Sequence, residues 1–147
     1  MYIMSRRVVI TGLGVCAPNG VGLTDFTQSL LEGKSGIRHQ PILEKLGFGC
    51  QIAGEPLVKD NLIDNYFTPL ERRGLNATGI VYGVIAGVDA WKDAGLKKNE
   101  TEEPSWDRGI LFGTGILGVD KFREAIHLID EGNVRRLGST SVIQTMA

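Results

Sequence analysis

The sequence predicts an α/β protein, and three observations support that fold class. Two short runs predict strands: residues 8–10 are apolar and typical of a strand buried in a covered parallel sheet, and residues 108–112 predict a second strand. Apolar residues at helical spacing follow each run and also lie between them. Each helical segment ends at a glycine, as helices commonly do. The predicted order is strand, helix, irregular segment, helix, strand, helix, which is typical of α/β domains.

Composition and charge narrow the class further. The chain has 147 residues, 42% of them apolar, and a formal net charge of −1. That length suits a single domain, and the lack of a charged block argues against nucleic-acid binding. The longest apolar run, residues 110–119, is about half of what a membrane span needs. Cys16 and Cys50 have no metal or disulfide spacing, so we expect a cytoplasmic protein without metal or cofactor.

The first helix is expected to begin at Thr24 as N-cap and to end at Gly33. Residues 33–67 carry several prolines and glycines and little periodicity, so they predict an irregular excursion with one short strand near residues 50–53. The excursion would separate the first helix from the next one.

The sequence Thr68-Pro69-Leu70-Glu71 is the clearest helix start, because it combines a capping box with proline in the first turn. A long helix is predicted from there to Gly95. Glycines recur in it every fourth residue, at Gly79, Gly83 and Gly87. Since each costs about 1 kcal/mol relative to alanine, we expect tight packing against that stripe.

A third helix is predicted from Val119 to Gly132, after the second strand. Residues 133–147 contain no complete element by these criteria, so the chain is expected to be cut short before its fold is complete.

Two glycine loops resemble dinucleotide-binding turns. In the first, Gly12, Gly14 and Ala17 have the spacing, but Pro18 to Gly20 would fall within the required first turns of the helix. In the second, Gly113 to Gly118 matches G-x-G-x-x-G fully, yet no acidic residue follows at a strand end. We interpret the second loop as a tight connection whose backbone approaches something bulky. A small nucleotide-binding α/β domain remains an alternative.

The other candidates for catalysis are isolated. Cys16 has no histidine nearby in sequence, and its apolar neighbours suit a structural thiol. His39 and His127 lie far apart, and Asp60 and Asp64 are more typical of a solvated helix face than of an acid/base pair. We predict no catalytic residue in this chain.

Five motifs, in order and at similar spacing, resemble the amino-terminal portion of elongating β-ketoacyl-acyl-carrier-protein synthases. The motifs are RRVVITGLGVCAPNG (6–20), LLEGKSGI (30–37), YFTPLERR (66–73), RGILFGTGI (108–116) and RRLGSTSV (135–142). The resemblance implies the first half of a thiolase-like layered α/β fold, lacking the segment with the nucleophile. It also implies an acyltransferase of fatty-acid or polyketide synthesis that uses acyl carrier protein and forms a homodimer or a synthase heterodimer.

In that family a cysteine at the start of a buried helix takes the acyl group, and two histidines assist decarboxylation of malonyl-carrier protein. The resemblance places the cysteine shortly after the point matching Ala147 and the histidines later still, so this chain alone is expected to be inactive. Ile116, with Gly115 beside it, matches the family position that lines the acyl pocket. The family usually continues with two glycines, whereas Leu117 and Gly118 stand here, so the accepted acyl length stays open. A non-catalytic partner resembling a chain-length factor is a further alternative.

Overall fold

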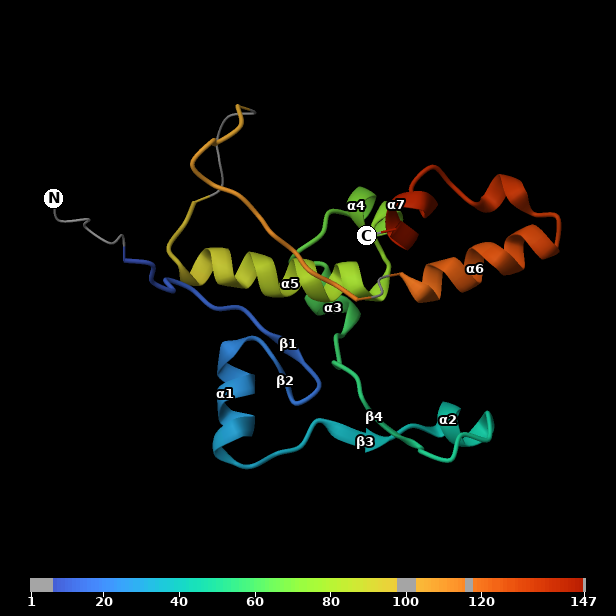
Figure 1. The fold of residues 1–147 in the computed structure, drawn as a ribbon, viewed down its shortest axis with the longest axis horizontal. Helices are drawn as coiled ribbons and strands as arrows, with labels where there is room; N and C mark the ends of the chain where they lie inside the picture. Colours follow the sequence, from blue (N-terminus) through green and yellow to red (C-terminus); the bar gives the residue numbers. More distant parts are fainter. Residues whose placement is uncertain (1–6, 98–102, 116–117, 147) are drawn as a thin grey trace, which may run out of the picture.

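A long helix, α5 (Thr78–Asp93), lies at the centre of the computed structural model, which describes residues 7–97, 103–115 and 118–146 (Figure 1). An extended amino-terminal segment and the hairpin of β1 (Cys16–Ala17) and β2 (Gly20–Val21) lie along one side of α5. A second extended segment, residues 103–115, crosses α5 on its way to the carboxyl-terminal helices. Helix α5 therefore connects the other parts of the chain.

Helix α1 (Leu23–Leu31) follows the β1–β2 hairpin directly. Its N-cap is Gly22, with φ of 87°, so the prediction of Thr24 as the cap was wrong. The reason is the hairpin, which ends at Val21 and leaves glycine to turn the chain into the helix in a conformation that suits it. The predicted helix end was correct, because Gly33 takes a φ of 64°.

The excursion at residues 33–67 contains four short elements. Strands β3 (Ile37–His39) and β4 (Ile52–Gly54) pair antiparallel, with Arg38 opposite Ala53. Helix α2 (Pro41–Lys45) lies between the two strands, and α3 (Asp60–Ile63) follows them.

Helix α4 (Pro69–Gly74) begins with the predicted capping box. The amide of Glu71 donates to Thr68 Oγ1 at 3.3 Å, and the amide of Thr68 donates to Glu71 Oε2 at 2.8 Å. The predicted single long helix was wrong, because residues 75–77 separate α4 from α5. Gly74 and Asn76 favour such a break, since both are poor helix formers. The predicted end at Gly95 is confirmed by its φ of 69°.

The carboxyl-terminal part contains α6 (Val119–Asp130), a 3₁₀ turn (Val134–Arg136) and α7 (Ser141–Met146). Helix α6 ends as predicted, with Gly132 at a φ of 73°. The expectation that residues 133–147 hold no complete element was wrong. Helix α7 is short and lacks a local start signal, and contacts with α6 and α5 stabilise it instead.

The two predicted strands are extended but unpaired. Residues 8–10 and 108–112 form no β-ladder, and Val8 and Leu111 are 95% and 101% exposed. The prediction of a buried strand at residues 8–10 and of a second strand at residues 108–112 was therefore wrong for the described structure. A strand needs a neighbour that accepts and donates its backbone hydrogen bonds, and here a helix, not a strand, lies beside each segment.

The core is small for the length of the chain. Among the described residues, only Phe67, Ala77, Val81 and Ile85 are buried hydrophobic residues. The solvent-accessible surface is 12051 Å², whereas a compact protein of 16.0 kDa exposes about 7,400 Å². Much apolar surface is thus left uncovered. Within the described ranges, no helix combines the length and the apolar content needed to cross a bilayer.

Candidate functional site

The glycine loop that begins at Gly113 connects the extended segment to α6. Apart from their own atoms and their two chain neighbours, no described residue lies within 4 Å of where a β-carbon would stand on Gly113 or Gly115. The close approach predicted for these glycines is thus not made within the described part of the chain. Ile116, the predicted acyl-pocket residue, lies outside the described residues. The assignment of Gly115 and Ile116 to an acyl pocket stays a prediction.

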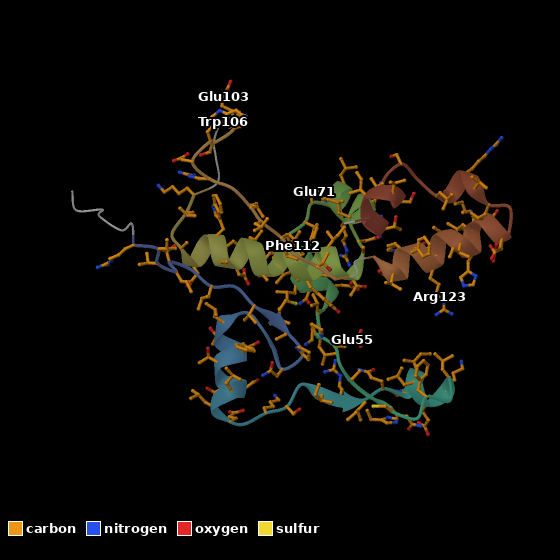
Figure 2. All side chains as sticks on the ribbon, viewed as in Figure 1. Glu55, Glu71, Glu103, Trp106, Phe112 and Arg123 are labelled. Atoms are coloured by element: carbon orange, nitrogen blue, oxygen red, sulfur yellow. The ribbon has the colours of Figure 1, made fainter. Side chains whose placement is uncertain are left out.

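The start of the loop is fixed by Phe112, whose ring packs on α5 (Figure 2). Its Cζ atom lies 2.5 Å from the position that a β-carbon would take on Gly83. The prediction of tight packing against the glycine stripe is therefore confirmed at Gly83. It is not met at Gly87, where nothing described beyond the neighbouring residues and backbone of α5 itself lies within 4 Å of that position.

The end of the loop is fixed by Gly118, which precedes α6. Gly118 has a φ of 68°, and a β-carbon on it would overlap the backbone carbonyl oxygen of Gln144 in α7. Both the conformation and the space therefore require glycine at this position.

Helix α5 has no side-chain cap of its own at its start, and the carboxyl-terminal helices supply one. Gln144 Oε1 accepts hydrogen bonds from the amides of Asn76 at 2.7 Å and Ala77 at 2.9 Å. Asp120 Oδ2 accepts from the amide of Thr78 at 3.2 Å and from its hydroxyl at 3.0 Å. These contacts satisfy amides that a helix start leaves without partners. Sequence reasoning missed both, because the partners are more than forty residues apart.

Two apolar hollows separate α5 from the extended segment before the loop. One, of about 820 Å³, is lined by Val88, Trp91, Leu96 and residues 108–110 among others. The other, of about 610 Å³, continues it along Ile80, Gly83 and Val84 to Phe112. The segment therefore contacts α5 at Phe112 and at Arg108, whose guanidinium carbon lies 5.9 Å from the centre of the Trp91 ring, with the hollows between these points.

Cys16 lies in the small core near Tyr66 and Asp89. Burial raises the pKa of the Cys16 thiol, and the Asp89 carboxylate raises it further. A thiol with a raised pKa has little thiolate at neutral pH and is a poor nucleophile. The structure thus supports the interpretation of Cys16 as a structural thiol.

Tyr66 donates a hydrogen bond from its hydroxyl to Asp89 Oδ1 at 2.9 Å. Burial, followed by this bond, raises the pKa of Tyr66 to about 12. The ammonium of Lys92 lies 5.0 Å from the centre of the Tyr66 ring. The hydroxyl is therefore a donor that stays protonated at neutral pH, and it ties the segment before α4 to α5.

The other chemistry-bearing candidates are dispersed. His39, in β3, has its Nε2 3.5 Å from Glu44, whereas His127 is exposed on α6. Cys50 is exposed in the excursion. Asp60 and Asp64 both pair with Arg72, so they hold α3 against α4. In the described ranges, no three His, Cys, Asp or Glu residues are placed to hold a metal ion.

The first glycine loop has the wrong shape for a dinucleotide. Residues Cys16 and Ala17 pair with Gly20 and Val21, so a hairpin stands where the fingerprint requires a helix start. A β-carbon on Gly12 or Gly14 would meet the backbone of α5, which explains these glycines by packing.

Comparisons with known proteins agree with one another. The sequence model described as "Beta-ketoacyl synthase, N-terminal domain" matches residues 5–147. The chain is 37% identical over 129 residues to 3-oxoacyl-[acyl-carrier-protein] synthase 2 of Vibrio harveyi, covering 86% of this chain and 30% of that protein. It is 38% identical over 119 residues to the Coxiella burnetii protein of the same name, covering 78% of this chain and 26% of that protein.

A crystal structure of a β-ketoacyl synthase from Burkholderia phymatum matches the fold with a TM-score of 0.72 at 23% identity. The match covers 97% of this chain and 34% of that one. The predicted thiolase-like fold is thus confirmed for the path of the backbone, although the strands of the described residues pair only in two small sheets, β1 with β2 and β3 with β4. The chain spans under a third of the length of the Vibrio harveyi and Coxiella burnetii proteins.

Proposed function

This chain belongs to the β-ketoacyl synthase family. On that premise we propose that it is the amino-terminal part of an enzyme that catalyses a decarboxylative Claisen condensation. The substrates would be an acyl thioester and malonyl-acyl-carrier protein, in fatty-acid or polyketide synthesis. The observation that carries the proposal is the family match over residues 5–147, together with two relatives named as synthases.

The proposed reaction has two stages. A cysteine thiolate attacks the acyl thioester, forms an acyl-enzyme and expels the carrier thiolate, which takes up a proton from solvent. Malonyl-carrier protein then loses carbon dioxide, and the resulting carbanion attacks the acyl-enzyme carbonyl. The carbon–carbon bond forms as the cysteine thiolate leaves. Neither a metal nor an organic cofactor is needed for this balance.

The chain itself would line part of the acyl pocket and hold it in place, and it would not supply the reacting groups. Its two cysteines match no family nucleophile, and the raised pKa of Cys16 makes that thiol a poor substitute. We propose that Gly115 and Ile116 border the acyl chain and that the nucleophile and histidines come from a further portion of the protein. The uncovered apolar surface, including Val9, Ile110 and Leu111, supports a large complementary partner.

The partners follow from the same proposal. We expect acyl carrier protein to deliver both substrates, and a second synthase subunit, identical or related, to complete a dimer. Both cysteines are free thiols, which fits the reducing conditions of a cytoplasm.

The test is to produce the complete gene product that carries this chain and incubate it with acyl- and malonyl-acyl-carrier protein. We expect β-ketoacyl-carrier protein, carbon dioxide and a covalent acyl-enzyme detected by mass spectrometry. The 147-residue chain alone, as matched control, should give none of the three. A complete product that never becomes acylated but changes the product length of a separate synthase would instead show a chain-length-factor role.

A further inference from the structure

Gln144 is unusual among the polar residues because it is only 6% exposed and every partner of its side-chain oxygen is a backbone amide. The two donors, Asn76 and Ala77, form the turn between α4 and α5. They lie 68 and 67 positions away in the sequence. A buried polar side chain with two well-placed partners fixes one geometry, since losing it leaves both amides unsatisfied.

The backbone of the same residue makes a second contact. The carbonyl oxygen of Gln144 occupies the space next to Gly118 that a side chain would need. Helix α7 is thus joined to α5 through the side chain of Gln144, and to the start of α6 through its main chain. Any movement of α7 relative to α5 moves the carbonyl that contacts Gly118.

Other contacts across this junction are more exposed. Asp120 also caps α5, but its bonds with Thr78 are open to solvent, where water can replace them. Thr140 makes only an apolar approach to α4, with its Cγ2 atom 3.2 Å from the position that a β-carbon would take on Gly74. The buried amide of Gln144 is therefore the contact most sensitive to substitution.

We infer that Gln144 is a positioning residue that fixes α7 against α5 and thereby fixes Gly118, where the glycine loop ends. In the proposed synthase, which this step presupposes, Gln144 would set the loop beside the acyl chain without touching substrate. Its loss should change the preference among acyl lengths, not only the amount of folded enzyme.

The experiment uses the complete gene product with three substitutions. Gln144→Leu removes the acceptor, and Gln144→Glu keeps an oxygen that can accept both amides. Ile85→Val removes one methylene from the core two turns away and serves as the control for lost stability. Amide hydrogen exchange of residues 75–78 and the ratio of kcat/KM for short and long acyl thioesters are measured for each.

For Gln144→Leu we expect exchange at Asn76 and Ala77 to rise by on the order of tenfold or more, and the acyl-length ratio to shift by several-fold. Gln144→Glu should keep both the exchange rates and the acyl-length ratio close to those of the unsubstituted protein. Ile85→Val should leave the ratio unchanged. The inference is overturned if exchange at Asn76 and Ala77 is the same in Gln144→Leu, or if the ratio moves no more than in Ile85→Val. If the unsubstituted product makes no β-ketoacyl thioester, the proposed function fails, and the exchange data alone decide whether Gln144 holds the helix start.

Discussion

The ring of Phe112 rests on Gly83, with its Cζ atom 2.5 Å from the position of an absent β-carbon. This contact holds the extended segment before the glycine loop against α5, whereas two hollows lie between α5 and the residues that precede Phe112. The glycine weakens the helix by about 1 kcal/mol relative to alanine, and the close approach of the ring gives that cost a structural reason.

We predict that Gly83→Ala destabilises the complete gene product by about 1 to 3 kcal/mol despite its better helix propensity, because the new methyl group overlaps the ring. Denaturant unfolding followed by circular dichroism measures the change. Gly87→Ala is the matched control in this chain, because Gly87 lies on the same helix and its β-carbon position has no described neighbour within 4 Å other than adjacent residues and backbone of α5 itself. Equal effects of the two substitutions would show that helix propensity alone matters.

A double-substitution cycle with Phe112→Leu isolates the contact. The smaller side chain should relieve the overlap, so Gly83→Ala is expected to cost less in the Phe112→Leu background than in the unsubstituted protein. An unchanged cost would mean that the ring is not what Gly83 accommodates.

Thr68→Ala tests the capping box of α4. Its hydroxyl accepts from the amide of Glu71, and we expect its removal to lower the free energy of unfolding by about 1 kcal/mol. Thr68→Ser keeps the hydroxyl and should behave nearly as the original residue. Thermal unfolding of both variants gives the comparison, and a Thr68→Ala variant as stable as Thr68→Ser would contradict the assigned cap.

Local signals in the sequence predicted local structure well. The capping box at Thr68 and the helix ends at Gly33, Gly95 and Gly132 depend on a few neighbouring residues, and all four are present in the structure. The Thr24 cap failed because the hairpin before it, formed by residues 16–21, was not predicted. Where the determining partner is adjacent in sequence, the residue types are sufficient.

Features that depend on distant partners could not be predicted this way. The apolar run at residues 8–10 signals a strand, but strand pairing needs a neighbour that the pattern does not identify. No local pattern marks Gln144 or Asp120, because the amides that their side chains accept from belong to the start of α5, far away in the sequence. The acyl-pocket assignment of Ile116 rested on resemblance alone, and it stays a prediction.

The raised pKa of Tyr66 predicts that the protein loses stability at alkaline pH. Its pKa is raised from 10.0 to about 12 by burial and by the hydrogen bond to Asp89, so the folded state holds this proton more tightly than the unfolded state. The contribution is complete below about pH 10 and is lost as the pH rises towards 12. Unfolding free energy measured across that range should fall less steeply in Tyr66→Phe. The same slope in both proteins would contradict the assignment.

Cys16 should react slowly with iodoacetamide, because burial and then Asp89 raise the pKa of its thiol. Mass spectrometry of tryptic peptides should show Cys50, which is exposed, modified first. Asp89→Asn removes the charge but not the burial, so the rate at Cys16 is expected to rise only modestly. Modification of Cys16 ahead of Cys50 would show that its surroundings are more open than the structure indicates.

A substitution at Leu111 tests whether a complementary portion of the protein covers the exposed apolar surface. It is 101% exposed here and lies in the segment predicted as the second strand. Placing aspartate there costs little in water but several kcal/mol in an apolar interior. We therefore predict that Leu111→Asp leaves the 147-residue chain as soluble as before, or more so, and severely destabilises the complete gene product. Yield and thermal unfolding of both forms measure this difference. If the complete product tolerates aspartate at this position, no apolar portion covers the segment, and the proposal of a complementary portion packed on Leu111 is wrong.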